Sequence, residues 1–324
     1  MEKLTTKLSL LIAVLLSAML STSSLALNTR IVGGEDATGD WPFVTALFMY
    51  SSSAKGYYLF CGGSLIDEHY VLTAAHCVYD LSSSDLDNLL VNIGDLTPYD
   101  TDDNELRYIN AVYVHPSFSY STLKYDFAIL ELDEASDKTP ISLGSVGDDD
   151  PVWTLGWGDM NPVYVNGNTS AEYDFPDTLQ IVGLTTMSND ECSDYYSSIT
   201  SIYDSMVCAF GAEVDDNTYT SVSYVGDSCQ GDSGGPLIKA SGDDYVLVGT
   251  VSFGDGDSDS IGCGDTNLPG VYGRVSKGES WIDSVLAGDV KPTAGTSSYY
   301  SSSSGSLPWF TILGLPLLLL LRRK

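Results

Sequence analysis

Short apolar segments separated by polar turns run through the chain from about residue 31 to residue 288. The segments are rich in Val, Ile, Tyr and Thr, and clusters of Gly, Asp, Ser and Pro interrupt them. Strand-length segments at this spacing, without long helical patterns, are typical of an all-β sandwich or barrel. Clear examples are FVTALFMY, YVLTAA, YINAVYVH, YVLVGTVSFG and GVYGRVS.

One stretch near the end of this region has a different period. In residues 277–288, KGESWIDSVLAG, the apolar Trp281, Ile282, Val285 and Leu286 recur at the spacing of one helical face. The sequence therefore predicts a helix late in an otherwise β-rich domain.

The N-terminus has the features of an export signal. Residues 1–26 begin with lysines, continue with an apolar run, and end with Ser24 and Ala26, the small residues that signal peptidase requires. Cleavage is expected after Ala26, which leaves residues 27–30 as a very short pro-segment. The alternative is a signal anchor that stays uncut.

The C-terminal end combines a polar stretch with a short apolar one. Residues 289–306 are serine-rich and predict a flexible linker, and residues 307–324 form a hydrophobic tail with a basic end. The apolar run reaches only about 22 Å as a helix, short of a hydrocarbon core of about 30 Å. This order resembles the GlyGly-CTERM sorting tails of bacterial surface proteins, although Ser-Gly-Ser stands where they have Gly-Gly. A permanent anchor is an alternative, and the terminal RRK disfavours a GPI signal.

The chain is strongly acidic. It contains 44 Asp and Glu residues against 14 Lys and Arg residues, for a formal net charge of −30. Such a surface repels phosphate backbones, so nucleic acid is not an expected partner. It would attract cationic partners toward a cleft, and most of the carboxylates are expected on a solvated surface.

Cysteine usage fits an exported protein. An even number of cysteines in an oxidising compartment favours three disulfides, with 15 possible pairings. No CxxC spacing occurs and the chain has only three histidines, so a zinc site is not expected. The six cysteines are Cys61, Cys77, Cys192, Cys208, Cys229 and Cys263.

Three separate motifs together contain the residue types of a nucleophilic hydrolase. LTAAHC ends in His76 and Cys77, YDFAILEL contains Asp126, and GDSCQGDSGGP contains Ser233. Each motif alone fits a packed core histidine, a turn aspartate or a tight loop. Together they supply a serine nucleophile, an imidazole that takes its proton, and a carboxylate that holds the imidazole in one tautomer. The glycines around Ser233 allow the Gly231 and Ser233 N–H groups to point at one developing oxyanion.

In this order the motifs resemble those of the trypsin-like serine proteases of the chymotrypsin family. IVGG, CGGSLI, TAAHC, GWG, GDSGGP and PGVY are all present, and the resemblance covers about residues 31–288. It implies two six-stranded antiparallel β-barrels that divide near residues 140–150, with the catalytic triad of His76, Asp126 and Ser233 in the cleft between them. The implied disulfides are Cys61–Cys77, Cys192–Cys208 and Cys229–Cys263.

The same resemblance implies a substrate pocket. Asp227 matches the residue at the base of the primary pocket, where a carboxylate favours an Arg or Lys side chain. Gly254 and Gly270 match the pocket walls and leave room for a long side chain, and Ser228 and Ser252 match further substrate-binding positions. The expected function is a serine endopeptidase that cleaves protein or peptide substrates after Arg or Lys.

Arg30 stands directly before IVGG, at the position of an activation site. The resemblance implies that a cut after Arg30 frees the Ile31 amine, which inserts beside Asp232 as a buried ion pair. Since Arg30 fits a pocket with Asp227 at its base, the expected activator is another trypsin-like protease or the enzyme itself. The signal and the tail predict a zymogen that is secreted or located at the cell surface, with membrane contact through the tail.

No cofactor is required by this chemistry. One acidic loop is nevertheless a candidate calcium site, because Asp95, Asp102 and Glu105 fall at spacings that resemble the family's calcium-binding loop. The alternative is a solvated acidic loop. The aspartates of residues 255–259 lack the glycine and the glutamate that a calcium loop needs.

Two other functions fit the motifs less well. A non-catalytic binding module on the same fold is disfavoured because no triad member is missing. A lipase or esterase is disfavoured because its nucleophile precedes the Asp and the His in the chain. His69 and His115 have no catalytic partner in these motifs and are expected to be structural or surface residues.

Overall fold

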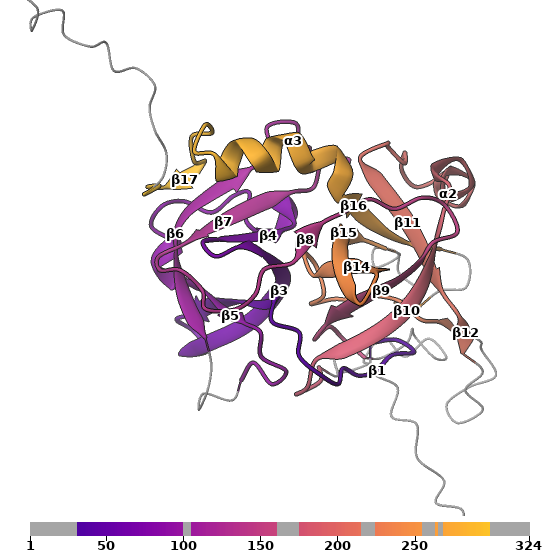
Figure 1. The fold of residues 1–324 in the computed structure, drawn as a ribbon, viewed down its shortest axis with the longest axis horizontal. Coiled ribbons are helices and arrows are strands. Elements are labelled where there is room, and N and C mark those ends of the chain that lie inside the picture. Colours follow the sequence, from indigo (N-terminus) through magenta and orange to yellow (C-terminus); the bar gives the residue numbers. More distant parts are fainter. Residues whose placement is uncertain are drawn as a thin grey trace, which may run out of the picture.

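Two antiparallel β-barrels lie side by side in the computed structural model (Figure 1). The structure describes residues 31–99, 105–160, 175–214, 224–254, 263–264 and 268–298. The first barrel uses strands between residues 44 and 132, and the second uses strands between residues 151 and 274. This arrangement confirms the all-β expectation and its two six-stranded barrels.

The first barrel closes through its strands β6 and β7. The spatial order is β6-β5-β2-β3-β4-β7, and β6 pairs again with β7. Short 3-10 helices η1 (Ala75–Cys77) and η2 (Leu86–Asn88) lie between β4 and β5. The strands are β2 Val44–Ser51, β3 Gly56–Asp67, β4 Tyr70–Thr73, β5 Leu89–Ile93, β6 Leu106–Val114 and β7 Ala128–Leu132.

The second barrel closes through β9. Its order is β9-β10-β11-β16-β15-β14, and β14 pairs again with β9. Two short strands extend this sheet: β1 (Glu35–Asp36) pairs with β10, and β8 (Ser142–Leu143) pairs in parallel with β15. A separate ladder joins β12 (Glu213–Val214) to β13 (Tyr224–Val225). The barrel strands are β9 Pro151–Gly156, β10 Gln180–Met187, β11 Met206–Gly211, β14 Pro236–Ser241, β15 Asp244–Phe253 and β16 Gly270–Arg274, and α2 is Asn189–Tyr196.

The alternation along β10 shows how the sequence builds a barrel wall. Val182 and Leu184 are buried, whereas Gly183 and Thr185 are exposed. Because successive side chains on a strand point to opposite faces, one face of β10 fills the barrel interior. β7 differs, since all five of its residues are buried.

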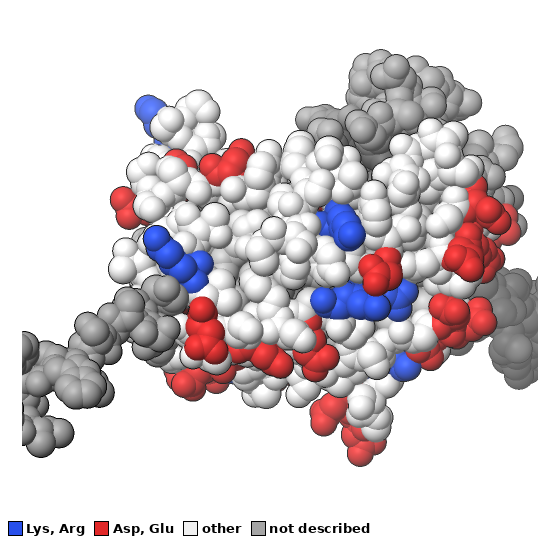
Figure 2. Space-filling model, turned by 90° about the horizontal axis from the view of Figure 1, so that it is seen from above, with Lys and Arg blue, Asp and Glu red and all other residues white. Residues whose placement is uncertain are grey.

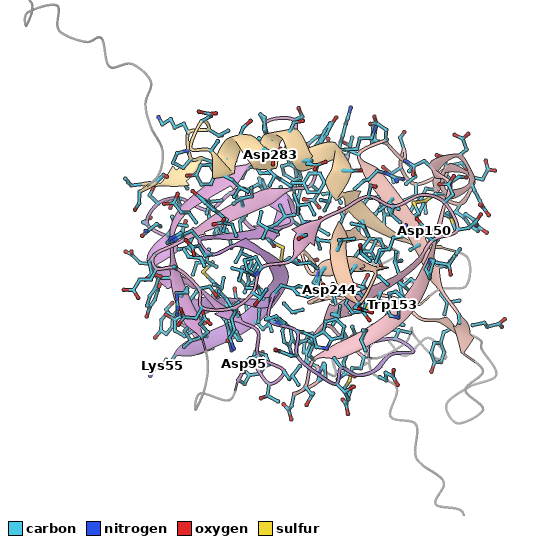
Figure 3. All side chains as sticks on the ribbon, viewed as in Figure 1. Lys55, Asp95, Asp150, Trp153, Asp244 and Asp283 are labelled. Carbon is cyan, nitrogen blue, oxygen red and sulfur yellow. A yellow bond between two sulfur atoms is a disulfide. The ribbon has the colours of Figure 1, made fainter. Side chains whose placement is uncertain are left out.

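Helix α3 (Val275–Leu286) confirms the predicted helix and begins two residues before the predicted start. It lies across the top of both barrels (Figure 1), with Asp283 on its outer side (Figure 3). Phe127 packs so closely against the helix that a Cβ atom at Gly278 would lie 3.2 Å from the Phe127 ring. The buried residues of α3 are Val275, Gly278, Trp281, Ile282 and Val285.

The two predicted ends of the chain lie outside the described residues. These are the signal peptide and pro-segment, residues 1–30, and the hydrophobic tail, residues 307–324. Among the residues that the structure describes, no helix has the length and apolar composition needed to cross a membrane.

All six cysteines are paired as the family resemblance implies. Cys61–Cys77 joins β3 to η1 and so fixes the turn that contains His76. Cys229–Cys263 joins two loops beside the predicted pocket. The third pair is Cys192–Cys208, and no free cysteine remains.

The linker predicted from residue 289 needs a correction, because residues 289–298 pack on the first barrel. Strand β17 (Ala294–Gly295) pairs with β6 and lies beside it in Figure 1. Ala294 is buried, and the Ser298 N–H donates to Glu131 Oε1 at 2.8 Å. Glu131 is itself fully buried, and its Oε2 accepts a hydrogen bond from Tyr113 at 2.7 Å. Although this segment is serine-rich, it forms a strand, and its Ser298 N–H supplies a hydrogen bond to the buried Glu131.

A chain that ends at Lys291 is expected to be less stable than one that ends at Ser306. An unsatisfied buried polar group costs about 1–3 kcal/mol, so losing the Ser298 N–H from Glu131, with the β17 pairing, should remove about 3 kcal/mol of unfolding free energy. Urea unfolding of both chains measures the difference, and equal midpoints would contradict it. Ser298→Pro in the longer chain removes the donor alone and should show part of the loss.

Candidate active site

The imidazole of His76 is fixed on a short crosslinked turn. Helix η1 follows β4 almost directly, and its last residue, Cys77, is bonded to Cys61 of β3. The Cys77 N–H also donates to the Ala74 carbonyl oxygen at 3.3 Å. The backbone around His76 is therefore held from both directions.

Asp126 is buried, with 1% of its surface exposed, and it faces three donors. Its Oδ1 accepts from the His76 backbone N–H at 2.8 Å, and its Oδ2 lies 2.7 Å from His76 Nδ1. The Ser252 hydroxyl donates to the same Oδ2 at 2.6 Å. A carboxylate in this position holds the imidazole proton on Nδ1 and leaves Nε2 as the basic nitrogen.

Ser252 was predicted to bind substrate, and in the structure its hydroxyl group is hydrogen-bonded to Asp126. Because its hydroxyl is bonded to Asp126, only the Ser252 backbone is left for a substrate contact. The side chain instead satisfies the buried carboxylate that orients His76. No short motif signals this contact, because the two residues are 126 positions apart.

Ser233 lies on the loop before β14, against the disulfide that anchors η1. Its carbonyl oxygen accepts from the Gly62 N–H at 2.7 Å and lies 3.7 Å from Cys77 Sγ. The next residue, Gly234, has a φ of 79°, and a Cβ atom there would lie 2.6 Å from the Gly62 carbonyl oxygen. Only glycine fits, so the residue after Ser233 allows this loop to approach β3 and η1.

The loop also presents two backbone donors. Gly231 has a φ of 102°, and a Cβ atom there would lie 3.2 Å from the Gly158 Cα. Within the described part of the chain, neither the Gly231 N–H nor the Ser233 N–H donates a hydrogen bond. Preorganised donors without an acceptor suit the stabilisation of negative charge that develops during a reaction.

Asp227 is buried close to the two glycines that were predicted as pocket walls. Its carboxylate is 4% exposed, and a Cβ atom at Gly270 would lie 2.7 Å from Asp227 Oδ1. A Cβ atom at Gly254 would lie 3.9 Å from Oδ2. Any side chain at Gly270 would therefore cover the carboxylate, and the structure brings these three predicted pocket residues together.

Among the described residues, the Asp227 carboxylate accepts hydrogen bonds from Ser228 and Gly264. The Ser228 N–H donates to Oδ1 at 2.8 Å, and the Ser228 hydroxyl lies 3.2 Å from the Tyr272 hydroxyl. The Gly264 N–H lies farther away, at 3.4 Å from Oδ2. Burial outweighs these donors and raises the pKa of Asp227 to about 7. Tyr272, which sequence reasoning missed, belongs to the PGVY motif.

Asp232, which directly precedes Ser233, is a second buried carboxyl group. It is 1% exposed and accepts from the Gly158 N–H at 2.7 Å and the Cys229 N–H at 2.8 Å. Burial raises its pKa to about 7, and the negative charge of Asp159 adds to the effect. Such a group gains most from a nearby cation.

The start of the described chain reaches the same region. Ile31 and Val32 are fully buried, and the Val32 carbonyl oxygen accepts from the Asp227 N–H at 3.0 Å. The first residues of IVGG are therefore packed next to the pocket loop. Arg30 lies outside the described residues.

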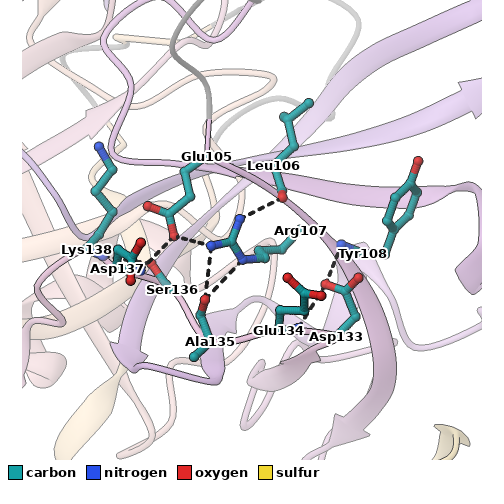
Figure 4. A network of polar contacts seen from close by, with 10 residues as sticks. All are labelled: Glu105, Leu106, Arg107, Tyr108, Asp133, Glu134, Ala135, Ser136, Asp137 and Lys138. Atoms are coloured by element: carbon teal, nitrogen blue, oxygen red, sulfur yellow. Dashed lines mark hydrogen bonds and ion pairs between the residues drawn. The ribbon is translucent and has the colours of Figure 1, made fainter.

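One of the predicted calcium ligands, Glu105, already has other partners. Glu105 Oε1 accepts from the Asp137 N–H at 3.0 Å and pairs with Arg107 at 3.1 Å (Figure 4). An arginine bound to a carboxylate competes with a metal for that oxygen. Asp95 follows β5 and is labelled in the lower part of Figure 3, and Asp102 lies outside the described residues.

One other group has the residue types of a metal site. Ligand atoms of Cys61, His76 and Cys77 all lie within 4.8 Å of one another. Both sulfur atoms belong to one disulfide, and a metal requires thiolates. These three residues are therefore not suited to bind a metal, and the disulfide holds the turn that contains His76.

Comparison with known proteins agrees with this geometry. The trypsin family matches residues 31–282. Trypsin 5G1 of Aedes aegypti is 34% identical over 81% of this chain and 87% of its own length, and Trypsin-1 of Astacus astacus is 33% identical over 78% and 98%. Serine proteinase stubble of Drosophila melanogaster is 35% identical over 79% of this chain and 31% of its own length. The chain belongs to the trypsin family of serine proteases and is a serine endopeptidase.

Proposed function

We propose that this protein is a secreted endopeptidase, made as a zymogen, that cleaves peptide bonds after Arg or Lys. The observation that carries the specificity is the buried Asp227 carboxylate, which lies close to Gly254 and Gly270, so that neither residue covers it with a side chain of its own. A long cationic side chain that enters this pocket supplies the counter-charge that Asp227 lacks.

The proposed chemistry assigns one role to each of the three triad side chains, and the observed His76–Asp126 contact supports it. As Ser233 Oγ attacks the substrate carbonyl, His76 Nε2 takes its proton, and Asp126 stabilises the resulting imidazolium through the 2.7 Å contact with Nδ1. The Gly231 and Ser233 N–H groups donate hydrogen bonds to the oxyanion. His76 then gives the proton to the leaving amine, and water repeats the sequence on the acyl-enzyme, which restores Ser233.

Activation is assigned to the Arg30–Ile31 bond. A cut there creates an ammonium group at Ile31, and in this proposal the group inserts beside Asp232, which is buried and accepts from two backbone N–H groups. Pairing the two charges removes the penalty that raises the Asp232 pKa. Because Asp232 directly precedes Ser233, the ion pair fixes the loop that carries the oxyanion donors.

Protein comprising residues 27–306 is expected to be inactive until trypsin cuts after Arg30. N-terminal sequencing and turnover of an arginyl peptide measure the two events together. Arg30→Gln should stay uncut and inactive, and Asp232→Asn should be cut and yet be about 100-fold less active or worse, because a buried charge then lacks its partner. Full activity before the cut would contradict the proposal. Self-activation predicts that Ser233→Ala stays uncut where the unsubstituted protein matures.

The proposal includes export and a transient membrane contact. Residues 1–26 act as the signal and residues 307–324 as the tail. With residues 289–298 packed on the first barrel, the linker shortens to residues 299–306. Acidic and basic side chains are both present on the face in Figure 2. The excess of acidic residues over the whole chain, 44 against 14, favours cationic partners and disfavours nucleic acid.

Calcium binding stays a prediction. The protease chemistry of this family needs no cofactor. The Glu105–Arg107 pair weakens the calcium candidate, since binding through Glu105 would have to compete with a formed ion pair.

A further inference from the structure

Tyr125, the residue before Asp126, has a backbone conformation that bulky residues rarely adopt. Its φ is 51°, in the left-handed region, where Cβ crowds the following carbonyl oxygen. Such residues persist only where the surrounding structure holds them, and they cluster at active sites. Neither the triad chemistry nor the pocket accounts for Tyr125.

The Tyr125 ring is held by stacking on His115. The two rings are parallel within 3°, and their centroids are 4.6 Å apart. The His115 ring also meets the Trp281 ring of α3 at 5.0 Å and 65°. His115 is 8% exposed, its Nδ1 accepts from the Ser117 N–H at 3.1 Å, and burial lowers its pKa to about 4. An uncharged imidazole thus connects helix α3 to the segment before Asp126.

The same residues fix the backbone on both sides of Asp126. The Phe127 N–H donates to the Tyr125 carbonyl oxygen at 2.8 Å, which closes a three-residue turn centred on Asp126. The Tyr125 N–H donates to Ser205 Oγ at 3.3 Å, and the His115 N–H donates to the Phe127 carbonyl oxygen at 3.0 Å. A change in φ at Tyr125 would rotate this turn and redirect the Asp126 side chain.

We propose that Tyr125 is a positioning residue for the triad: its ring, stacked on His115, holds the left-handed backbone that turns Asp126 toward His76. The turn can rotate only slightly before these contacts break, because both Asp126 oxygens face His76. Oδ1 lies 2.8 Å from the His76 backbone nitrogen, and Oδ2 lies 2.7 Å from Nδ1. A rotated turn cannot keep both contacts. Tyr125 acts on the reaction through Asp126.

Three substitutions separate the ring from the backbone conformation. Tyr125→Phe keeps the stack, whereas Tyr125→Ala and Tyr125→Asn both remove it. Asn adopts the left-handed conformation more readily than Ala. In the activated enzyme, Tyr125→Phe should retain kcat, and Tyr125→Ala should lower kcat by up to about 100-fold with little change in KM. Tyr125→Asn should lie between them.

The proton NMR signal of His76 Nδ1–H gives a second readout, because its downfield position reports the short hydrogen bond to Asp126. The signal should persist in Tyr125→Phe, move upfield or broaden in Tyr125→Ala, and recover in part in Tyr125→Asn. A purely packing role would lower the stability of the Ala and Asn variants alike and leave this signal unchanged. An unchanged signal in Tyr125→Ala, or equal kcat in the Ala and Asn variants, overturns the proposal.

Because the inference rests on the triad assignment, Asp126→Asn is the reference variant. Low kcat in both Asp126→Asn and Tyr125→Ala supports the positioning role. Low kcat in Asp126→Asn with full kcat in Tyr125→Ala rejects the positioning role alone. Full kcat in Asp126→Asn rejects the triad itself.

Discussion

Replacing Ser233 with alanine in the activated enzyme is expected to lower kcat about a millionfold. The substitution removes the only atom that can form the acyl-enzyme in the proposed mechanism, while the pocket and the Gly231 N–H remain. The residual rate should still exceed the uncatalysed rate by about 10³–10⁴, because substrate binding and oxyanion stabilisation persist. Steady-state turnover of an arginyl peptide measures the change.

The intact mass of the protein after treatment with an acylating ester distinguishes loss of the nucleophile from loss of the fold. A slowly deacylated ester should add one acyl group to the unsubstituted enzyme and none to Ser233→Ala. Ser241→Ala, at the exposed end of β14, is the matched control and should acylate normally. Acylation of the Ser233→Ala protein would move the nucleophile to another residue.

The triad could be proposed from local motifs, because each motif also has a local structural role. Gly234 follows Ser233 because a Cβ atom there would overlap β3, and Cys77 follows His76 because its disulfide holds the turn. The motifs come from both barrels and meet where the barrels pack together, as at the hydrogen bond from the Gly62 N–H to the Ser233 carbonyl oxygen, and no spacing along the chain encodes this packing. The resemblance to a family supplied that step.

The remaining errors concern contacts that composition does not signal. Residues 289–298 are polar enough to suggest a linker, and yet the β6 edge and the buried Glu131 give their backbone N–H groups better partners than water. His115 is packed as a structural residue, in agreement with the expectation, but its stacking on Tyr125 depends on the φ of Tyr125 and could not be predicted from the sequence. Backbone strain of this kind is visible only in three dimensions.

Asp227→Ser is expected to lower kcat/KM for substrates cleaved after Arg or Lys by about 10²–10⁴. This range corresponds to about 3–5 kcal/mol, the cost of leaving one partner of a buried ion pair alone. Substrates with an apolar residue at the cleaved position should lose far less, since the pocket keeps its glycine walls. Peptides that differ only at the cleaved residue measure the preference.

Asp244→Ser is the matched control for this substitution. It removes the same charge from an exposed position at the start of β15, so specificity should not change. A preference for basic residues that survives in Asp227→Ser would place the specificity determinant elsewhere, with the acidic surface as the next candidate.

The raised pKa of Asp227 makes the same pocket sensitive to pH. Without ligand, burial raises the pKa of Asp227 to about 7, so below that pH the carboxyl group holds its proton. A bound guanidinium favours the ionised form and lowers this pKa, so binding at pH 6 should release a proton, and affinity should fall as the pH drops through about 7. Calorimetry of a small guanidinium compound in two buffers of different ionisation enthalpy counts the protons. Asp227→Ser should abolish the release, whereas proton uptake by the unsubstituted enzyme would show that Asp227 is not the group that meets the cation.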